Sequence, residues 1–229
     1  MTDSSRSQIL GNIRKSIENS HNFETDRLAV VDRRISARDP NTVPARSAGD
    51  AAARLALFVT ESERVDATTH FTSSEELPGA VAAYLSGNAL APSIKAAPHA
   101  LLKNVPWSKE PGLAVTFGPT DGGDEVGLSV AFAGIAETGT LALHSGPEGP
   151  TTLNFLPDYH LVVLPVSCLL GTYEEAWAAL RATGNGAMPR TVNWVTGPSR
   201  TADIEQTLLM GAHGPRSLHI LILDDKKAT

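Results

Sequence analysis

Residues 159–183 have the sequence YHLVVLPVSCLLGTYEEAWAALRAT. The run from Tyr159 to Ser167 is almost entirely apolar, which predicts a strand that is buried on both faces. A helix is expected to follow, because Thr172 and Glu175 have the spacing of a capping box. A buried strand followed directly by a helix is typical of the α/β fold class.

The same alternation continues toward the C-terminus. The next expected elements are a strand, a helix and a nearly continuous apolar strand, namely TVNWVTG (191–197), RTADIEQTLLMG (200–211) and SLHILIL (217–223). Alternating strands and helices through residues 160–223 indicate βαβ units and a largely parallel sheet flanked by helices. Residues 113–144 contain three strand-like segments with no helix between them, so part of the sheet is expected to be antiparallel. We therefore predict one mixed α/β domain over residues 48–229.

The first 47 residues have a different character. Isoleucines at i, i+4 and i+8 from Ile9, with Leu10 beside them, predict a short amphipathic helix over residues 5–18. Between Asn19 and Ser47 the charges alternate in sign and two prolines interrupt the chain, which indicates a linker or a surface arm. Residues 1–47 are thus expected to form an N-terminal helix and linker arm. The helix must bury its apolar stripe either on its own domain or on a partner.

Composition excludes several classes of function. The net charge of −6 leaves no basic surplus to neutralise phosphates, so no nucleic-acid partner is expected. The single cysteine, Cys168, excludes an internal disulfide and any zinc or iron–sulfur site built from several thiolates of this chain, so we expect no bound cofactor and no metal. No apolar stretch approaches the roughly 20 residues of a membrane span, and the N-terminus lacks the apolar core of a signal peptide. We therefore expect a cytoplasmic protein.

The stretch TGPSRTADIEQTLLMGAHGP (196–215) is the first candidate site. If a helix begins near Thr201, its N-terminus could receive an anion. Gly197 would permit close approach of the backbone, Ser199 or Thr201 could cap, and Arg200 could bind a carboxylate or phosphate. The same residues would also serve as an ordinary helix start. The sequence leaves both interpretations open.

Further along this stretch, Asp203 and Glu205 would lie about 200° apart on the expected helix, so they cannot both face one metal or substrate atom. A paired-carboxylate mechanism is therefore not expected. His213 could act as a general base, but a histidine near a helix C-terminus also interacts favourably with the helix dipole. A structural role for His213 is favoured.

The second candidate is GIAETGTLAL (134–143), in which Glu137, Thr138, Gly139 and Thr140 form a polar tetrad between apolar segments. One interpretation is a tight turn, with Gly139 at positive φ. The other is a carboxylate, Glu137, held beside two hydroxyls as a base, nucleophile or hydrogen-bond acceptor.

Taken together, AGIAETGTLAL, LPDYHLVVLPVS and TGPSRTADIEQTLLMGAHGP resemble the lactate utilization protein C family, the stand-alone members of the LUD domain group. The resemblance implies a fold similar to that of the sugar-phosphate isomerases and CoA-transferases. It also implies a role in bacterial growth on L-lactate, beside two iron–sulfur partner proteins with which lactate is oxidised to pyruvate. The implied site comprises Glu137 as catalytic candidate and, as ligand-binding candidates, Thr138, Gly139, Thr140, Gly197, Ser199, Arg200, Thr201, Asp203 and His213.

Three hypotheses remain. The favoured one is a non-redox subunit or accessory protein that binds a small carboxylate or phosphate ligand and docks on the iron–sulfur partners. The second is an independent enzyme with a CoA-transferase-like or isomerase-like site, in which Glu137 reacts and Arg200 holds an anionic substrate. The third makes both stretches purely structural turns and caps.

Overall fold

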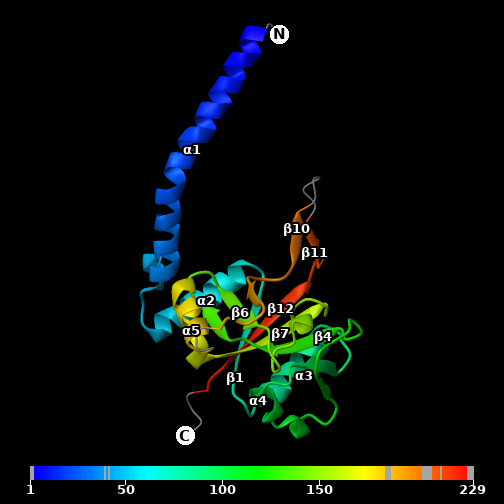
Figure 1. Ribbon diagram of the computed structural model, residues 1–229. Helices are drawn as coiled ribbons and strands as arrows, with labels where there is room; N and C mark the ends of the chain where they lie inside the picture. Colours follow the sequence, from blue (N-terminus) through cyan, green and yellow to red (C-terminus); the bar gives the residue numbers. More distant parts are fainter. Residues whose placement is uncertain are drawn as a thin grey trace. The chain divides into compact units, whose positions relative to one another are not determined.

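The computed structural model describes residues 3–38, 40, 42–183, 187–202, 208–211 and 213–225. The chain divides into two compact units, residues 1–42 and 43–229, which we describe separately. The helix of the first unit is α1 (Asp3–Ala37). The second unit holds the strands and the other helices (Figure 1). Among the described residues, no helix is both long enough and apolar enough to cross a membrane.

The second unit has four α-helices and four short 3-10 helices in its described part. They are α2 (Ala51–Arg64), α3 (Leu77–Gly87), α4 (Ala100–Lys103), α5 (Tyr173–Thr183), η1 (Ala45–Ser47), η2 (Trp107–Lys109), η3 (Thr151–Asn154) and η4 (Val166–Cys168). The strands are β1 (Thr68–Thr72), β2 (Ser93–Ala96), β3 (Ala114–Phe117), β4 (Val126–Val130), β5 (Ala133–Ile135), β6 (Thr140–His144), β7 (Tyr159–Pro165), β8 (Leu169–Leu170), β9 (Val192–Val195), β10 (Arg200–Ala202), β11 (Leu208–Met210) and β12 (Ser217–Leu223).

Three sheets are formed. The main sheet has the order β1-β12-β7-β4-β2-β3, and every neighbouring pair in it is parallel. A second sheet has the order β8-β5-β6-β9, in which β6 runs antiparallel to both of its neighbours. The third is the two-stranded antiparallel ribbon β10-β11. The predicted α/β class and parallel sheet are confirmed, whereas the expected antiparallel strands lie in the second sheet and not in the main one.

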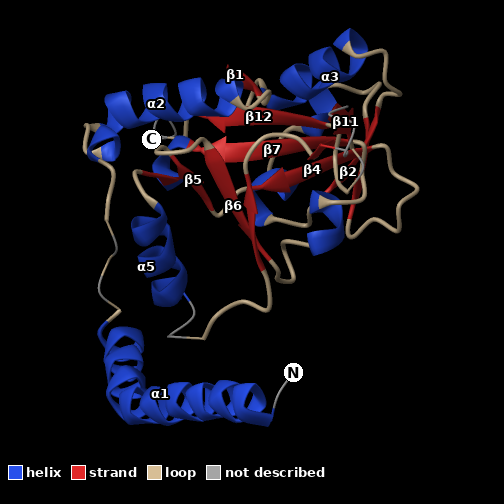
Figure 2. Cartoon of the chain, turned by 90° about the horizontal axis from the view of Figure 1, so that it is seen from above, coloured by secondary structure: helices blue, strands red, loops and turns tan. Residues whose placement is uncertain are grey.

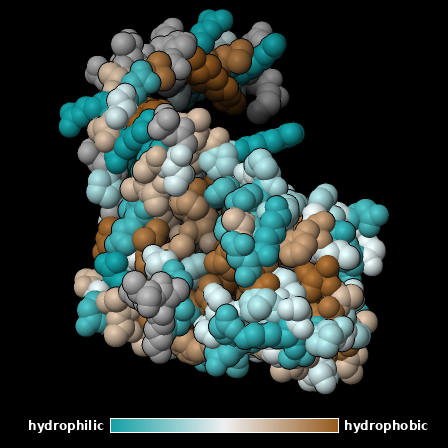
Figure 3. Space-filling view, turned by 90° about the horizontal axis from the view of Figure 1, so that it is seen from below, coloured by the Kyte–Doolittle hydropathy of each residue, from teal (hydrophilic) through white to brown (hydrophobic). Residues whose placement is uncertain are grey.

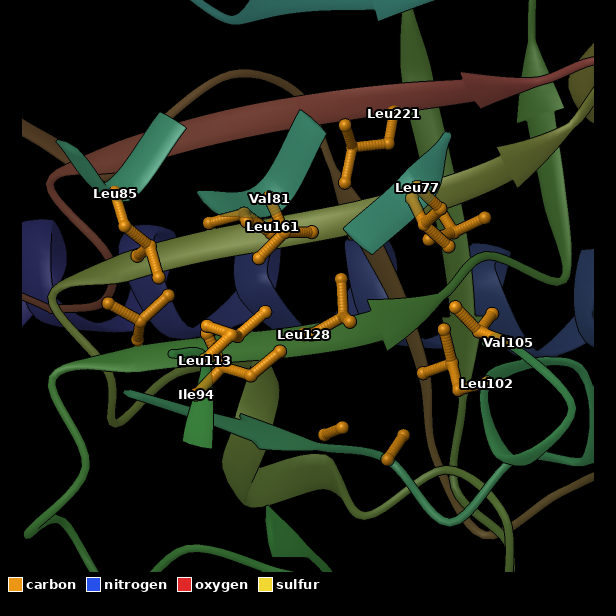
Figure 4. Close-up of a cluster of buried hydrophobic side chains, with 14 of the residues drawn as sticks. Leu77, Val81, Leu85, Ile94, Leu102, Val105, Leu113, Leu128, Leu161 and Leu221 are labelled. Carbon is orange, nitrogen blue, oxygen red and sulfur yellow. The ribbon is translucent and has the colours of Figure 1, made fainter. Parts of the chain in front are cut away.

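Successive side chains of β7 pack on opposite faces of the main sheet, and both faces are buried. Leu161 and Val163 belong to a cluster that includes side chains of α3, and this cluster is drawn in Figure 4. Val162 and Leu164 belong to a second cluster that includes Phe58 of α2 and residues of the second sheet. Neighbouring side chains of a strand point to opposite faces, so one apolar run fills two cores. Figure 2 shows helices and the second sheet arranged around the main sheet.

The predicted helix over residues 200–211 is wrong. In its place Arg200–Ala202 and Leu208–Met210 pair as antiparallel strands, with Thr201 opposite Leu209. The helix prediction depended on capping residues, which also suit turns, whereas the leucines and methionine at its end form one run and no helical stripe. The predicted site residue Asp203 lies outside the described residues.

The predicted end of the N-terminal helix is also wrong, because α1 continues to Ala37 and residues 19–37 form no linker. No glycine or proline interrupts residues 12–39, and Pro40 is the first proline of the chain. Alternating charges, taken above as a mark of a linker, are compatible with an exposed helix. Leu28, Val31 and Ile35 have helical spacing in this segment.

Candidate functional site

The two candidate stretches both rest on the C-terminal end of α2 through a glycine. Gly139 has a φ of 65° and Gly197 a φ of 73°. A Cβ atom at Gly139 would lie 2.3 Å from the backbone nitrogen of Ser62, and one at Gly197 would lie 2.3 Å from the carbonyl oxygen of Val65. Both positions therefore require glycine, because of the backbone conformation and because of the close approach.

A cluster of hydroxyl groups joins the two stretches. The Oγ1 atom of Thr140 lies 2.7 Å from that of Thr138, 2.7 Å from that of Thr196 and 2.9 Å from the Tyr173 hydroxyl. Thr140 is fully buried at the start of β6. The structure thus brings Thr138, Gly139 and Thr140 next to the turn that begins at Thr196, although none of the three lines the pocket described below.

Glu137 is held at the start of a helix. Its side chain is buried, and its Oε1 atom accepts a hydrogen bond of 3.0 Å from the backbone nitrogen of Tyr173, the first residue of α5. A carboxylate in this position is stabilised by the positive end of the helix dipole. Glu137 does not line the pocket. Glu137, a catalytic candidate in the sequence analysis, therefore has a structural role at the start of α5.

A pocket of about 200 Å³ lies beside the second stretch. Its lining is Asn154, Phe155, His160, Trp194, Val195, Thr196, Gly197, Pro198, Ser199, His213, Gly214, Pro215 and Leu218. The segments 196–199 and 213–215 are joined directly, since the backbone nitrogen of Ser199 donates to the carbonyl oxygen of Pro215 at 2.8 Å. Three predicted site residues, Gly197, Ser199 and His213, therefore meet in one pocket.

His160 and Asn154 are buried polar residues of this lining, and His160 has only 1% of its surface exposed. Its Nε2 atom lies 3.0 Å from the Ser129 hydroxyl, which donates to Oδ1 of Asn154 at 3.4 Å. Because that hydroxyl gives its proton to Asn154, we assign the imidazole proton to Nε2 of His160. Nδ1 is then a hydrogen-bond acceptor, and no described residue provides it with a partner.

Burial also fixes the charge of His160. Removal from water lowers the pKa of its imidazole to about 4, because the charged form loses its hydration. The ring is therefore neutral near pH 7. At this pH His160 supplies no positive charge for an anion.

Arg200, expected to hold an anion, is engaged elsewhere. Its guanidinium lies against the carbonyl oxygen of Val65 and 3.2 Å from a carboxylate oxygen of Asp66. Thr201 lies in β10, so the turn after Gly197 leads into a strand and the expected helix N-terminus is not formed there. The pocket lining itself contains no Arg or Lys.

Sequence reasoning missed His160, Asn154 and Trp194. His160 stands in the apolar run of β7, and Ser129 stands in the apolar run of β4, so each is a polar residue inside a buried strand. That pattern was a usable signal for a polar site. What the sequence did not reveal is that β4 and β7 are neighbours, which places the two side chains in contact.

A second cavity, of about 280 Å³, lies at the carboxyl end of β4. His99 and His144 line it together with Glu148, whose Oε2 atom is 3.9 Å from Nε2 of His99. Neither candidate stretch contributes to this cavity. The described residues contain no group of three or more His, Cys, Asp or Glu side chains arranged to hold a metal ion.

Comparison with known proteins identifies relatives that cover between 43% and 91% of the chain. A model of the LUD domain family matches residues 124–223. An uncharacterized protein of Neisseria meningitidis is 44% identical over 99 residues, and lactate utilization protein C of Shouchella clausii is 35% identical over 103 residues. These two alignments cover 43% and 44% of this chain and only 42% and 45% of the two relatives, which is less than half of their length.

Two matches from Deinococcus radiodurans, one to a sequence and one to a solved structure, extend over longer ranges. Its lactate utilization protein C is 30% identical over 216 residues, an alignment that covers 91% of this chain and 99% of the relative. The crystal structure of a DUF162 family protein from this organism superposes with a TM-score of 0.58 at 26% identity. That superposition covers 76% of this chain and 99% of the other, so the similarity in fold extends well beyond the site.

Proposed function

Since the chain belongs to the lactate utilization protein C family, whose members share the LUD domain, we propose that it is a non-redox component of a bacterial lactate utilization system. In this proposal it binds a small hydroxy acid in the pocket formed by residues 196–199 and 213–215. The proposal of a hydroxy acid as ligand rests on Nδ1 of His160, a buried acceptor for which no described residue is a hydrogen-bond partner.

The pocket chemistry suits a small molecule with one hydroxyl and one carboxylate. The ligand hydroxyl would donate to Nδ1 of His160, the acceptor without a described partner. The carboxylate would accept from the hydroxyls of Ser199 and Thr196 and from a ring N–H of His213. The volume of about 200 Å³ is below the range of pockets for drug-sized ligands, so a ligand of few atoms is favoured.

The redox step is assigned to partner proteins. The chain has one cysteine, whereas an iron–sulfur cluster takes about four thiolates. The proposed partners are the iron–sulfur subunits implied by the family resemblance, and the proposed reaction of the whole system is oxidation of lactate to pyruvate. This chain would bind the hydroxy acid or its product and contribute no electron carrier.

Calorimetric titration of the purified chain tests the ligand class. L-lactate should bind about tenfold more tightly than pyruvate, because pyruvate has no hydroxyl to donate and would leave Nδ1 of His160 without a partner. His160→Gln should abolish this preference. The matched control is His70→Gln, which changes an exposed histidine of β1 and should keep the preference. Equal affinity of the wild type for both acids, or binding of neither, would sink the ligand proposal.

Genetic tests address the role in the cell. Deletion should abolish growth on L-lactate, whereas the purified chain alone should oxidise no lactate. A pull-down of the tagged protein from lactate-grown cells should recover iron–sulfur proteins. Normal growth on lactate after a clean deletion would overturn the role, independently of the result for the ligand.

A further inference from the structure

The helix α1 carries the same apolar pattern twice. Leu10, Ile13 and Ile17 have spacings of three and four residues, and so do Leu28, Val31 and Ile35. The two triplets are 18 residues apart, which is five turns of an α-helix, so both lie on one face. From this pattern we infer that α1 is a self-association helix, which pairs antiparallel with α1 of a second copy of this chain.

Within the first unit, the apolar stripe of α1 is exposed. Its side chains are between 48% exposed, at Leu10 and Val31, and 67% exposed, at Ile35. Figure 3 shows apolar atoms at the surface of this helix. A single amphipathic helix gains most of its stability from packing of its apolar face. An exposed stripe along a 35-residue helix therefore indicates a surface that a partner covers.

The positions of these residues favour a second copy in antiparallel orientation. Leu10 and Ile35 are equally distant from a point between residues 22 and 23, and Ile13 and Val31 are equally distant from residue 22. A two-fold axis near residue 22 therefore places the first triplet of each helix against the second triplet of the other. Self-complementarity of this kind is the requirement for a symmetric dimer interface.

Charges beside the stripe agree with this orientation. Arg14 follows Ile13 and Asp32 follows Val31, so the two charged residues lie on the same flank of the stripe and both are exposed. In an antiparallel pair like flanks meet, and the two-fold axis brings Arg14 of each copy level with Asp32 of the other. In a parallel pair these residues would be about 27 Å apart along the axis. Two opposite-charge pairs thus form only in the antiparallel arrangement.

Light scattering on the full-length chain is the first test. The expected mass is twice the 24.1 kDa of one chain. Replacing both Ile13 and Val31 by Asp should give a monomer, because each copy then places carboxylates in the apolar interface. Val30→Asp is the matched control, since Val30 is 58% exposed on α1 but lies off the stripe, and this variant should remain dimeric. A monomeric wild type, or a dimer in the Ile13/Val31 double variant, would overturn the proposal.

Disulfide trapping tests the orientation. In a Cys168→Ser background, Ile13→Cys and Val31→Cys each introduce the chain's single thiol. Under mild oxidation an equal mixture of the two variants should form the mixed dimer, whereas each variant alone should remain largely reduced. Efficient trapping of either variant with itself would show a parallel pair and refute the antiparallel arrangement. This inference is independent of the proposed ligand and of the iron–sulfur partners.

Discussion

Gly139 and Gly197 occupy matching environments, yet the stretches around them differ in what they offer a ligand. Each glycine has positive φ and rests on the backbone at the end of α2, and each is next to a threonine of the hydroxyl cluster around Thr140. Around Gly139 the polar groups are directed to other parts of the protein, with Glu137 bound to the start of α5. Around Gly197 they line a pocket.

This difference shows that residue types alone do not distinguish a structural turn from a ligand-binding site. Both stretches combine glycine, hydroxyls and a charged residue. The first is followed by β6, which is buried within the second sheet, so its polar groups become internal hydrogen bonds. The second is followed by a ribbon that leaves the sheet, and residues 213–215 return beside it. The four predictions below test this division.

Acid is expected to have the largest effect, through two histidines that are buried in the neutral form. Burial lowers the pKa of His160 and of His219 to about 4, from about 6.5 in the unfolded chain. Between these pH values the two histidines are protonated in the unfolded state but neutral in the native state. The free energy of unfolding therefore decreases as the pH falls from about 6.5 to 4. The free energy of unfolding should drop by about 3 kcal/mol for each histidine.

Urea denaturation at about pH 7 and pH 4.5 measures this loss. His160→Gln should remove the part of this loss that comes from His160. The free energy of unfolding of the variant should therefore depend less steeply on pH, and its value at about pH 7 should also change. A slope that His160→Gln does not alter would contradict a buried neutral imidazole.

Glycine replacement should have the next largest effect. Gly139→Ala should lower the free energy of unfolding by about 3 kcal/mol or more, because the new Cβ atom meets the α2 backbone in an unfavourable conformation. Gly197→Ala should cost a similar amount, since its surroundings match. Gly112→Ala is the control, as a Cβ there meets no atom within 4 Å. Thermal or chemical denaturation of all three distinguishes the outcomes, and a tolerated Gly139→Ala would refute the packing described.

The third prediction contrasts Glu137 with Ser199. Glu137→Ala should reduce the free energy of unfolding by about 1–2 kcal/mol, because α5 loses a carboxylate at its N-terminus. Lactate affinity should not change. Ser199→Ala should show the reverse pattern, with stability within about 0.5 kcal/mol of the wild type and weaker lactate binding. If Glu137→Gln folds normally but no longer binds lactate, Glu137 takes part in the ligand site. That result would favour the hypothesis of an independent enzyme.

Arg200→Ala should have the smallest effect. Its ion pair with Asp66 is exposed, and exposed pairs contribute about 0.5 kcal/mol or less. Asp66→Asn should produce a change of similar size, and neither variant should alter lactate binding. Calorimetric titration together with denaturation measures both quantities. A large loss of affinity in Arg200→Ala alone would indicate that this arginine leaves Asp66 to hold an anion.

The sequence was sufficient for the elements with strong, regular patterns. The strands β7 and β12 are long apolar runs, and α5 combines a capping box with a charged first turn, so each could be predicted. The hairpin at residues 200–210 could not, because its capping residues suit a helix start and a turn equally well. The choice depends on strand pairing, which local sequence does not encode.

The site was predictable only in part, for the same reason. Gly197, Ser199 and His213 were identified from one stretch of chain, and they do line the pocket. His160 and Asn154 reach it from other segments, and their hydrogen-bond chain through Ser129 depends on the pairing of β4 with β7. The assignments of Glu137, Thr138, Thr140, Arg200, Thr201 and Asp203 to a ligand site stay predictions.

The pairing of β1 with β12 has a consequence for how this chain is made. Thr68 lies opposite His219 in that pair, so the first strand of the main sheet finds its neighbour only after some 150 further residues have been synthesised. Contacts between residues so far apart in the sequence form slowly. Until β12 has left the ribosome, β1 has no neighbour in the main sheet and β7 presents an unpaired edge. Unpaired strand edges favour aggregation, so β12 has the further role of closing both edges once it is synthesised.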